Sequence, residues 1–229
     1  MKERNLDKEA LEENFSSQNV KLSILKIIGR GARSGKAELL LSNGSSFFIP
    51  QKMVLQNDLE PGITLTEKQA DELKSRAEYI LAKKKALELL GLREHSVYRL
   101  KQKLIQREFS LEIINKVLPE LQEEGFLSDK RFIEIWIRAR LRRHPEGYRS
   151  LFAGLIKAGI SSEEARLYLI SFFEEHDIDE ILTQAAEKIM KKSNINRDKL
   201  INELKNRGFE YSSIIRYVNQ YFPDSSSFL

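Results

Sequence analysis

The chain has 229 residues, 41% of them hydrophobic and 31% charged, a composition that excludes an intrinsically disordered protein. It contains no cysteine, which excludes disulfides and thiolate chemistry and favours a reducing compartment. The charged start MKERNLDKEALEEN is not a secretory signal, and no apolar run approaches the roughly 20 residues of a membrane span. We therefore expect a cytoplasmic protein without membrane contact. The net charge of +4 permits a polyanionic partner without requiring one.

The first patterned segment predicts a small β region over residues 20–66. Strands are expected at 21–28, 36–42 and 45–50, with a glycine-rich loop between the first two. Asn43-Gly44 lies between the second and third, and this dipeptide between short apolar runs is the strongest short-range signal for a hairpin.

The run GRGARSGK in that loop resembles a phosphate-binding loop, but its spacing differs. Three residues separate Gly31 from Gly35-Lys36 where a Walker loop has four, and Ala37 replaces the hydroxyl residue. A dinucleotide fingerprint is also excluded, because Gly29, Gly31 and Gly35 follow the pattern GxGxxxG. A strand is expected next, whereas a phosphate loop opens a helix. We interpret the run as a hairpin tip whose basic side chains could contact a polyanion: Arg30, Arg33 and Lys36.

From residue 67 onward a helical period replaces the strand pattern, and the pattern occurs three times. The leading leucines Leu100, Leu151 and Leu200 are separated by 51 and 49 residues. Further apolar residues occupy equivalent positions in the three repeats. We call each set of three a column and predict that the columns are core: Leu104/Leu155/Leu204, Phe109/Ile160/Phe209, Ile114/Ala165/Ile214, Leu118/Leu169/Val218 and Leu90/Leu141/Met190. Gly159 and Gly208 are expected to end the middle helices in a left-handed conformation. Ser161 and Glu164 predict a capping box, and Ser110 is expected to begin the equivalent helix of the first repeat.

The expected fold is mainly α: three tandem three-helix-bundle repeats in an elongated curved array, preceded by a small β-hairpin or β-meander region. Such an array offers a long surface for an extended partner. The predicted boundaries are an N-terminal extension at 1–19, the β region at 20–66, a helical connector at 67–77, repeats at 78–126, 127–175 and 176–222, and a tail at 223–229.

The central segment GFLSDKRFIEIWIRARLRRHPEGYRSLFAGLIKAGIS resembles the RecX family, regulators of the RecA recombinase. The matching positions there are Gly125, Phe126, Leu127, Asp129, Arg131, Phe132, Trp136, Arg140, Arg142, Gly147, Leu155, Lys157, Gly159 and Ile160. Upstream, the segment LREHSVYRLKQKL matches through Arg93, Ser96, Leu100 and Leu104. The sequence departs from the family at Glu108, where a glycine is usual, and at Arg99, where an acidic residue is common.

The resemblance implies a helical modulator that binds in the groove of the RecA–single-stranded DNA filament and limits its assembly, ATP hydrolysis and strand exchange. It also implies a protein without catalytic activity or cofactor, and we expect a monomer that contacts single-stranded DNA directly or through the filament. Whether this chain inhibits or supports recombination is left open by the sequence.

Basic side chains gather at the end of the helix expected after Asp129. Arginine pairs bidentately with phosphates and carboxylates, so Arg138, Arg142, Arg143 and Arg149 are expected to contact the filament or its DNA. Lys157 is added by its place in the family pattern, and Lys101 and Lys103 belong to a second basic surface that includes Lys83–Lys85 and Arg107. The alternative is a solvated face with local pairs to Glu134 and Glu146. Trp136 is expected in the core, because its spacing matches Phe132 and Ala139.

Residues suited to catalysis or metal binding do not cluster in the sequence. His95, His144 and His176 are scattered, so neither a metal site nor a histidine-driven triad is predicted. Two other interpretations stay open beside recombinase regulation. One is a helical array that binds DNA without the recombinase, and the other is a structural scaffold.

Overall fold

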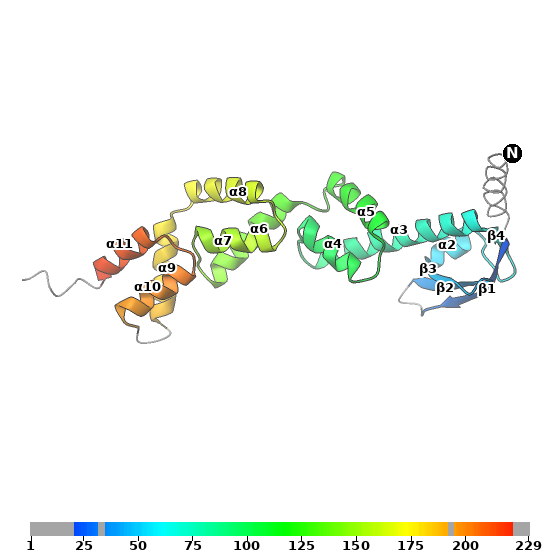
Figure 1. Ribbon diagram of the computed structural model, residues 1–229, viewed down its shortest axis with the longest axis horizontal. Helices are drawn as coiled ribbons and strands as arrows, with labels where there is room; N and C mark the ends of the chain where they lie inside the picture. The colour runs from blue at the N-terminus through cyan, green and yellow to red at the C-terminus, as the bar shows by residue number, and fades with distance from the viewer. Residues whose placement is uncertain (1–20, 32–34, 192–194, 222–229) are drawn as a thin grey trace, which may run out of the picture. The chain divides into compact units, whose positions relative to one another are not determined.

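In the computed structural model, which describes residues 21–31, 35–191 and 195–221, a small sheet precedes a series of helices (Figure 1). The chain is mainly helical, with a small antiparallel N-terminal β region, as expected. The chain divides into two compact units, one made of residues up to Leu89 with Lys103–Glu123, the other of Leu90–Gln102 and the residues from Glu124 onward. The predicted extension at 1–19, the tail at 223–229 and Arg33 lie outside the described residues.

The first unit begins with four antiparallel strands in the order β3-β2-β1-β4. Their bounds are β1 Lys21–Gly29, β2 Lys36–Leu41, β3 Ser46–Pro50 and β4 Thr64–Thr66. The Asn43-Gly44 turn joins β2 to β3, and Gly44 has a positive φ of 82°. The three strands expected from the sequence are confirmed within one residue at each end. The short β4 and the helix α2 (Gln51–Gln56) were not expected.

The glycine-rich run is a hairpin connection between β1 and β2. The amide of Arg30 donates to the carbonyl of Lys36 (3.0 Å), and β2 begins directly after Gly35. Arg30 forms an ion pair with Glu38 on the neighbouring strand. Because a strand follows where a phosphate loop opens a helix, the hairpin interpretation is confirmed.

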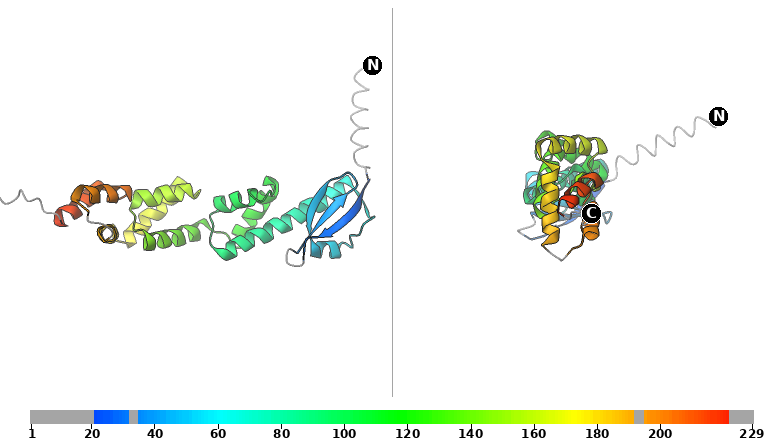
Figure 2. Two further views of the ribbon diagram at one scale, coloured as in Figure 1. Left: turned by 90° about the horizontal axis from the view of Figure 1, so that it is seen from below. Right: turned by 90° about the vertical axis from the view of Figure 1, so that its left-hand side faces the viewer.

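One face of the sheet packs on the start of the long helix α3 (Glu67–Leu92), which Figure 2 shows beside the strands. Alternate residues of the strands point into this core, as Leu39 and Ile49 do, and α3 contributes the small side chains Ala70 and Ala77. Small residues let a helix approach a sheet closely, and the burial of the apolar strand residues stabilises the pair.

The helices follow one another in three groups of three, and we call these groups repeats 1, 2 and 3. Repeat 1 contains α3, α4 (Val97–Ile105) and α5 (Leu111–Glu123); repeat 2 contains α6 (Asp129–Arg143), α7 (Tyr148–Lys157) and α8 (Ser162–Glu175); repeat 3 contains α9 (Ile178–Met190), α10 (Arg197–Asn206) and α11 (Tyr211–Tyr221). The order agrees with the expected repeats. Their exact boundaries as domains stay a prediction.

The predicted apolar columns are core. The columns led by Leu100, Leu104, Ile114 and Leu118 are buried in all three repeats, with no side chain more than 4% exposed. Two departures occur. Phe109 is half-buried while its counterparts Ile160 and Phe209 are buried, and the column of Leu90, Leu141 and Met190 is half-buried throughout.

The middle helix of each repeat ends in a residue with left-handed backbone. Gly159 and Gly208 have φ values of 85° and 80°, as predicted. The helices that follow are capped as expected: Ser161 accepts from the amide of Glu164 (3.2 Å), and Ser110 accepts from that of Ile113 (3.4 Å). The equivalent residue of repeat 1 is Glu108, with φ 64°.

We expect Glu108→Gly to stabilise the first unit. A side chain in the left-handed region costs about 1 kcal/mol or more relative to glycine, because Cβ crowds the backbone carbonyl. The variant should be roughly 1 kcal/mol more stable to denaturant. Glu108→Ala is the matched control, since it removes the carboxylate and keeps the strained φ. An equal gain from alanine would show that charge, and not backbone strain, limits stability here.

Within the second unit, which includes residues 90–102 with the start of α4, two contacts of the same kind join successive repeats. In each, the residue before a middle helix donates a hydrogen bond to the turn that ends the next middle helix. Ser96 Oγ donates to the carbonyl of Ala158 (2.6 Å), and the amide of Gly147 donates to the carbonyl of Arg207 (2.8 Å). Ser96 and Gly147 are equivalent positions in the repeats, as are Ala158 and Arg207. The offsets of 51 and 49 residues that relate the repeats in the sequence therefore also relate the residues that make these contacts.

Candidate functional site

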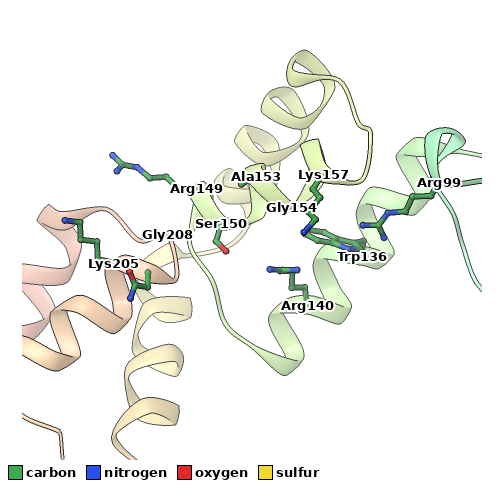
Figure 3. A pocket seen from close by; sticks show the side chains of 11 residues that line it. Arg99, Trp136, Arg140, Arg149, Ser150, Ala153, Gly154, Lys157, Lys205 and Gly208 are labelled. Carbon is green, nitrogen blue, oxygen red and sulfur yellow. The ribbon is translucent and has the colours of Figure 1, made fainter. Parts of the chain in front are cut away.

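A groove of about 520 Å³ in the second unit is lined by cationic side chains (Figure 3). We call it the basic groove. Its lining comes from α4, α6, α7, α10 and the turn after α10: Arg99, Trp136, Arg140, Arg149, Ser150, Ala153, Gly154, Lys157, Lys205, Asn206 and Gly208. Arg99, Arg140 and Lys157 lie near the ring of Trp136, and Arg149 and Lys205 lie on the other side. Five of the lining residues are cationic, and no lining residue carries a carboxylate.

Trp136 forms a wall of the groove, and its position depends on a glycine in the facing helix. A Cβ atom on Gly154 would lie 2.4 Å from Cη2 of the indole, so only glycine lets the ring lie against α7. The guanidinium of Arg140 lies 4.9 Å from the ring centre. The interpretation of Trp136 as core is correct for one side of the ring only. The indole packs against the buried cluster of repeat 2, but the side chain is half-buried and borders the groove.

Two of the groove arginines are held by acidic residues beside the groove. Arg140 Nε donates to Glu146 (2.6 Å), which also accepts from Ser150 (2.9 Å). Arg149 makes two hydrogen bonds to Glu210 of repeat 3, at 3.1 and 3.2 Å. These bonds orient the guanidiniums but leave the positive charge of the groove in excess, because Arg99, Lys157 and Lys205 have no ion-pair partner within the described residues.

The electrostatics of Arg99 favour an anion in the groove. Burial lowers the pKa of its guanidinium, and the neighbouring Arg93 lowers it further. Arginine nevertheless stays charged at any physiological pH. A half-buried cation without an ion-pair partner is stabilised by a bound anion, so the groove suits phosphates or carboxylates.

A second hollow of about 640 Å³ adjoins the basic groove and shares Arg99, Trp136 and Arg140 with it. Arg93 and Arg143 add positive charge there. The acids in its lining are Glu94 and Glu146, which are paired with Arg131 (2.5 Å) and Arg140. The cationic surface therefore extends beyond the groove along α6.

The structure separates the side chains that the sequence placed in one site. Arg149 and Lys157 line the basic groove, and Arg143 lines the adjoining hollow. Arg142 lines a different hollow beside Glu175, Asp177 and Glu180. Arg138 pairs with Glu134 (2.8 Å), which is the local pairing that the sequence left as an alternative. Lys101 and Lys103 lie on α4 and line neither hollow.

Of the groove residues, only Arg149 and Lys157 were candidate contacts from the sequence, and those that it missed include Arg99, Arg140, Gly154 and Lys205. Gly154 could have been recognised from the sequence, because glycine inside a helix is disfavoured by about 1 kcal/mol and commonly marks a place where another group packs closely against the helix. Arg99 and Lys205 carried no such signal, since single basic residues on amphipathic helices are ordinary.

Several residues of the central segment that resembles the family have structural roles. Arg131 donates to the carbonyls of Gly125 (3.1 Å) and Phe126 (2.8 Å), which fixes the turn before α6. Asp129 accepts from the amide of Val97 (2.9 Å), and burial raises the pKa of its carboxyl above the ordinary value despite that bond. Asp129 thereby joins the start of α4 to α6, and neither side chain lines the groove.

Within the described parts of the chain, no group of three or more His, Asp or Glu side chains is placed to hold a metal ion. Over the same residues, no helix has the length and apolar character needed to cross a bilayer.

Comparison with known proteins gives consistent matches. Residues 82–121 match the family described as RecX, first three-helix domain. A regulatory protein RecX from Pelodictyon phaeoclathratiforme is 37% identical over 134 residues, covering 56% of this chain and 81% of that protein. One from Streptococcus sanguinis is 28% identical over 180 residues, covering 76% and 68%. A crystal structure of a regulatory protein RecX superposes with a TM-score of 0.60 at 20% identity, covering 87% of this chain and 99% of that one.

Proposed function

The chain belongs to the RecX family, and on that premise we propose that it regulates the RecA recombinase by binding the RecA–single-stranded DNA filament. In this proposal it restrains filament assembly, and with it ATP hydrolysis and strand exchange. It has no catalytic role of its own, and the basic groove is the main contact.

The observation that carries the proposal is the excess of positive charge in the groove. Five cations from four helices face a space with no carboxylate in its lining, and three of them have no ion-pair partner within the described residues. A nucleoprotein filament presents phosphates and acidic side chains along its length, and arginine and lysine bind both. A groove lined by cations from several helices suits such a partner better than a small molecule.

The test follows ATP hydrolysis by RecA on single-stranded DNA while the protein is added, with filament length measured by electron microscopy. We expect hydrolysis to slow and filaments to shorten at amounts up to one protein per RecA protomer. Unchanged hydrolysis and unchanged filament length at that ratio would contradict the proposal. A rise in both would show that this chain supports recombination, which contradicts the restraining role but not the filament as partner.

A second candidate is direct binding of DNA without the recombinase. The half-exposed indole of Trp136 beside Arg140 favours it, because bases stack on such rings in complexes with single strands. Affinity for DNA alone that falls steeply with salt, and that RecA does not change, would support this candidate over the first.

A further inference from the structure

The turn after the middle helix differs between repeat 1 and the other repeats. In repeats 2 and 3 the start of a preceding helix lies against this turn so closely that only glycine fits. A Cβ on Gly159 would be 2.2 Å from Cβ of Tyr98, and one on Gly208 would be 2.3 Å from the amide nitrogen of Ser150. Glu108 has a Cβ at the equivalent position. A helix start therefore cannot dock on repeat 1 in the same way.

Repeat 1 has a hollow of about 550 Å³ at this turn, within the first unit. It is lined by Lys36, Leu81, Lys84, Lys85, Glu88, Gln106, Arg107, Glu108 and Phe109. Four cations face two carboxylates, and one of these, Glu88, is paired with Lys85 (2.8 Å). That pairing lowers the pKa of Glu88. The hollow therefore has a net positive charge, and its exposed cations include Lys84 and Arg107.

An exposed aromatic ring, Phe48, lies near one lining residue of this hollow, Lys36. Lys36, at the start of β2, lines the hollow and holds its ammonium 5.9 Å from the centre of the Phe48 ring. Phe48 lies on β3 with 48% of its surface exposed, on the face of the sheet opposite to the core residue Ile49. Lys36 therefore links the exposed ring to the other cations of the hollow. Single-stranded nucleic acids use both kinds of group, with bases stacked on rings and phosphates on cations.

We propose that Phe48 and the hollow at the Arg107–Phe109 turn form a second contact for single-stranded nucleic acid. One base stacks on Phe48, and the adjoining phosphates lie against Lys36, Lys84 and Arg107. A duplex is unsuited to this site, because its bases are already stacked on one another. An acidic peptide would use the cations but would gain little from the ring. The contact is in the first unit and does not require the recombinase.

The test measures fluorescence anisotropy of a short labelled oligo-dT with the full chain in the absence of RecA. We expect Phe48→Ala to weaken binding about five- to 150-fold, the range that one stacked base contributes. Phe48→Leu should weaken it similarly, because leucine keeps the apolar volume and removes the ring. Lys84→Glu with Arg107→Glu should weaken binding at least tenfold and reduce its dependence on salt.

Matched controls separate this contact from the basic groove. Phe126→Ala removes a ring of similar exposure (51%) in the second unit, and Lys52→Glu with Lys74→Glu makes the same charge change elsewhere in the first unit. Both should leave affinity nearly unchanged. Trp136 is the single tryptophan of the chain, so its fluorescence reports the groove independently.

Two results would overturn the proposal. One is oligo-dT affinity that both Phe48 variants leave unchanged while Trp136 is still quenched by DNA. The other is competition by poly-glutamate that is as effective as competition by unlabelled oligo-dT, which would assign the hollow to an acidic protein segment. Neither result bears on regulation of RecA, which is measured by ATP hydrolysis.

Discussion

Reversing the charges of Lys157 and Lys205 together is expected to raise the amount of protein needed to slow RecA-dependent ATP hydrolysis by about tenfold to a hundredfold. Both ammonium groups line the basic groove, and neither has an ion-pair partner within the described residues. Replacing two phosphate contacts by two repulsive carboxylates removes about 1 kcal/mol or more per site, and each 1.4 kcal/mol is a factor of ten. The measurement is a titration of hydrolysis at fixed RecA and DNA.

Two further double variants show whether the shift in that titration is specific to the basic groove. Lys52→Glu with Lys74→Glu changes net charge equally at exposed positions of the first unit and should shift the midpoint little. Arg142→Glu with Arg143→Glu tests the contacts first expected from the sequence, and its effect should be smaller because Arg142 lies beside Glu175, Asp177 and Glu180. If the Arg142/Arg143 variant were the more damaging one, the filament contact would lie along α6 and not in the groove.

Gly208→Ala is expected to destabilise the second unit by roughly 2–4 kcal/mol. Two effects combine: φ is 80°, and the new Cβ would lie 2.3 Å from the backbone nitrogen of Ser150, an atom that cannot move aside as the end of a flexible side chain could. Denaturant unfolding measures the loss, and the contact of repeat 2 with repeat 3 should be the part that weakens.

Gly125→Ala separates the two effects. Gly125 also has a positive φ, 75°, but no atom lies within 4 Å of a Cβ placed there. Gly125→Ala should therefore lose only the stability that a side chain at a positive φ costs, about 1 kcal/mol. Equal losses at 125 and 208 would show that the close approach of the repeats contributes nothing to stability.

The elements that the sequence predicted are those with a repeating local pattern. The hairpin at Asn43-Gly44, the glycine turns at 159 and 208 and the buried leucine columns each follow from a rule that operates within a few residues. The strand β4 and the helix α2 were missed because three and six residues are too short to show a period. β4 exists because it pairs with β1, for instance through Leu22 and Leu65, and that partner is distant in the sequence.

The basic groove was only partly predictable for a related reason. Counting arginines along one segment grouped Arg138, Arg142, Arg143 and Arg149, but the first three have different surroundings: Arg138 pairs with Glu134, Arg142 lines a hollow with three acids, and Arg143 lines the hollow next to the groove. The groove instead combines Arg99 with Lys157 and Lys205, which come together only because the repeats dock through their turns. Sequence spacing describes one helix at a time, whereas this site belongs to the packing between helices.

The docking of each middle helix on the turn of the next one has a consequence for synthesis of the chain. Ser96 leaves the ribosome 62 residues before Ala158, the residue that accepts its hydrogen bond. Gly147 precedes its acceptor, Arg207, in the same order. Lys205 and Gly208, two residues of the groove wall, emerge well after Arg99, Trp136 and Lys157. A nascent chain that has not yet reached residue 208 therefore lacks a complete groove.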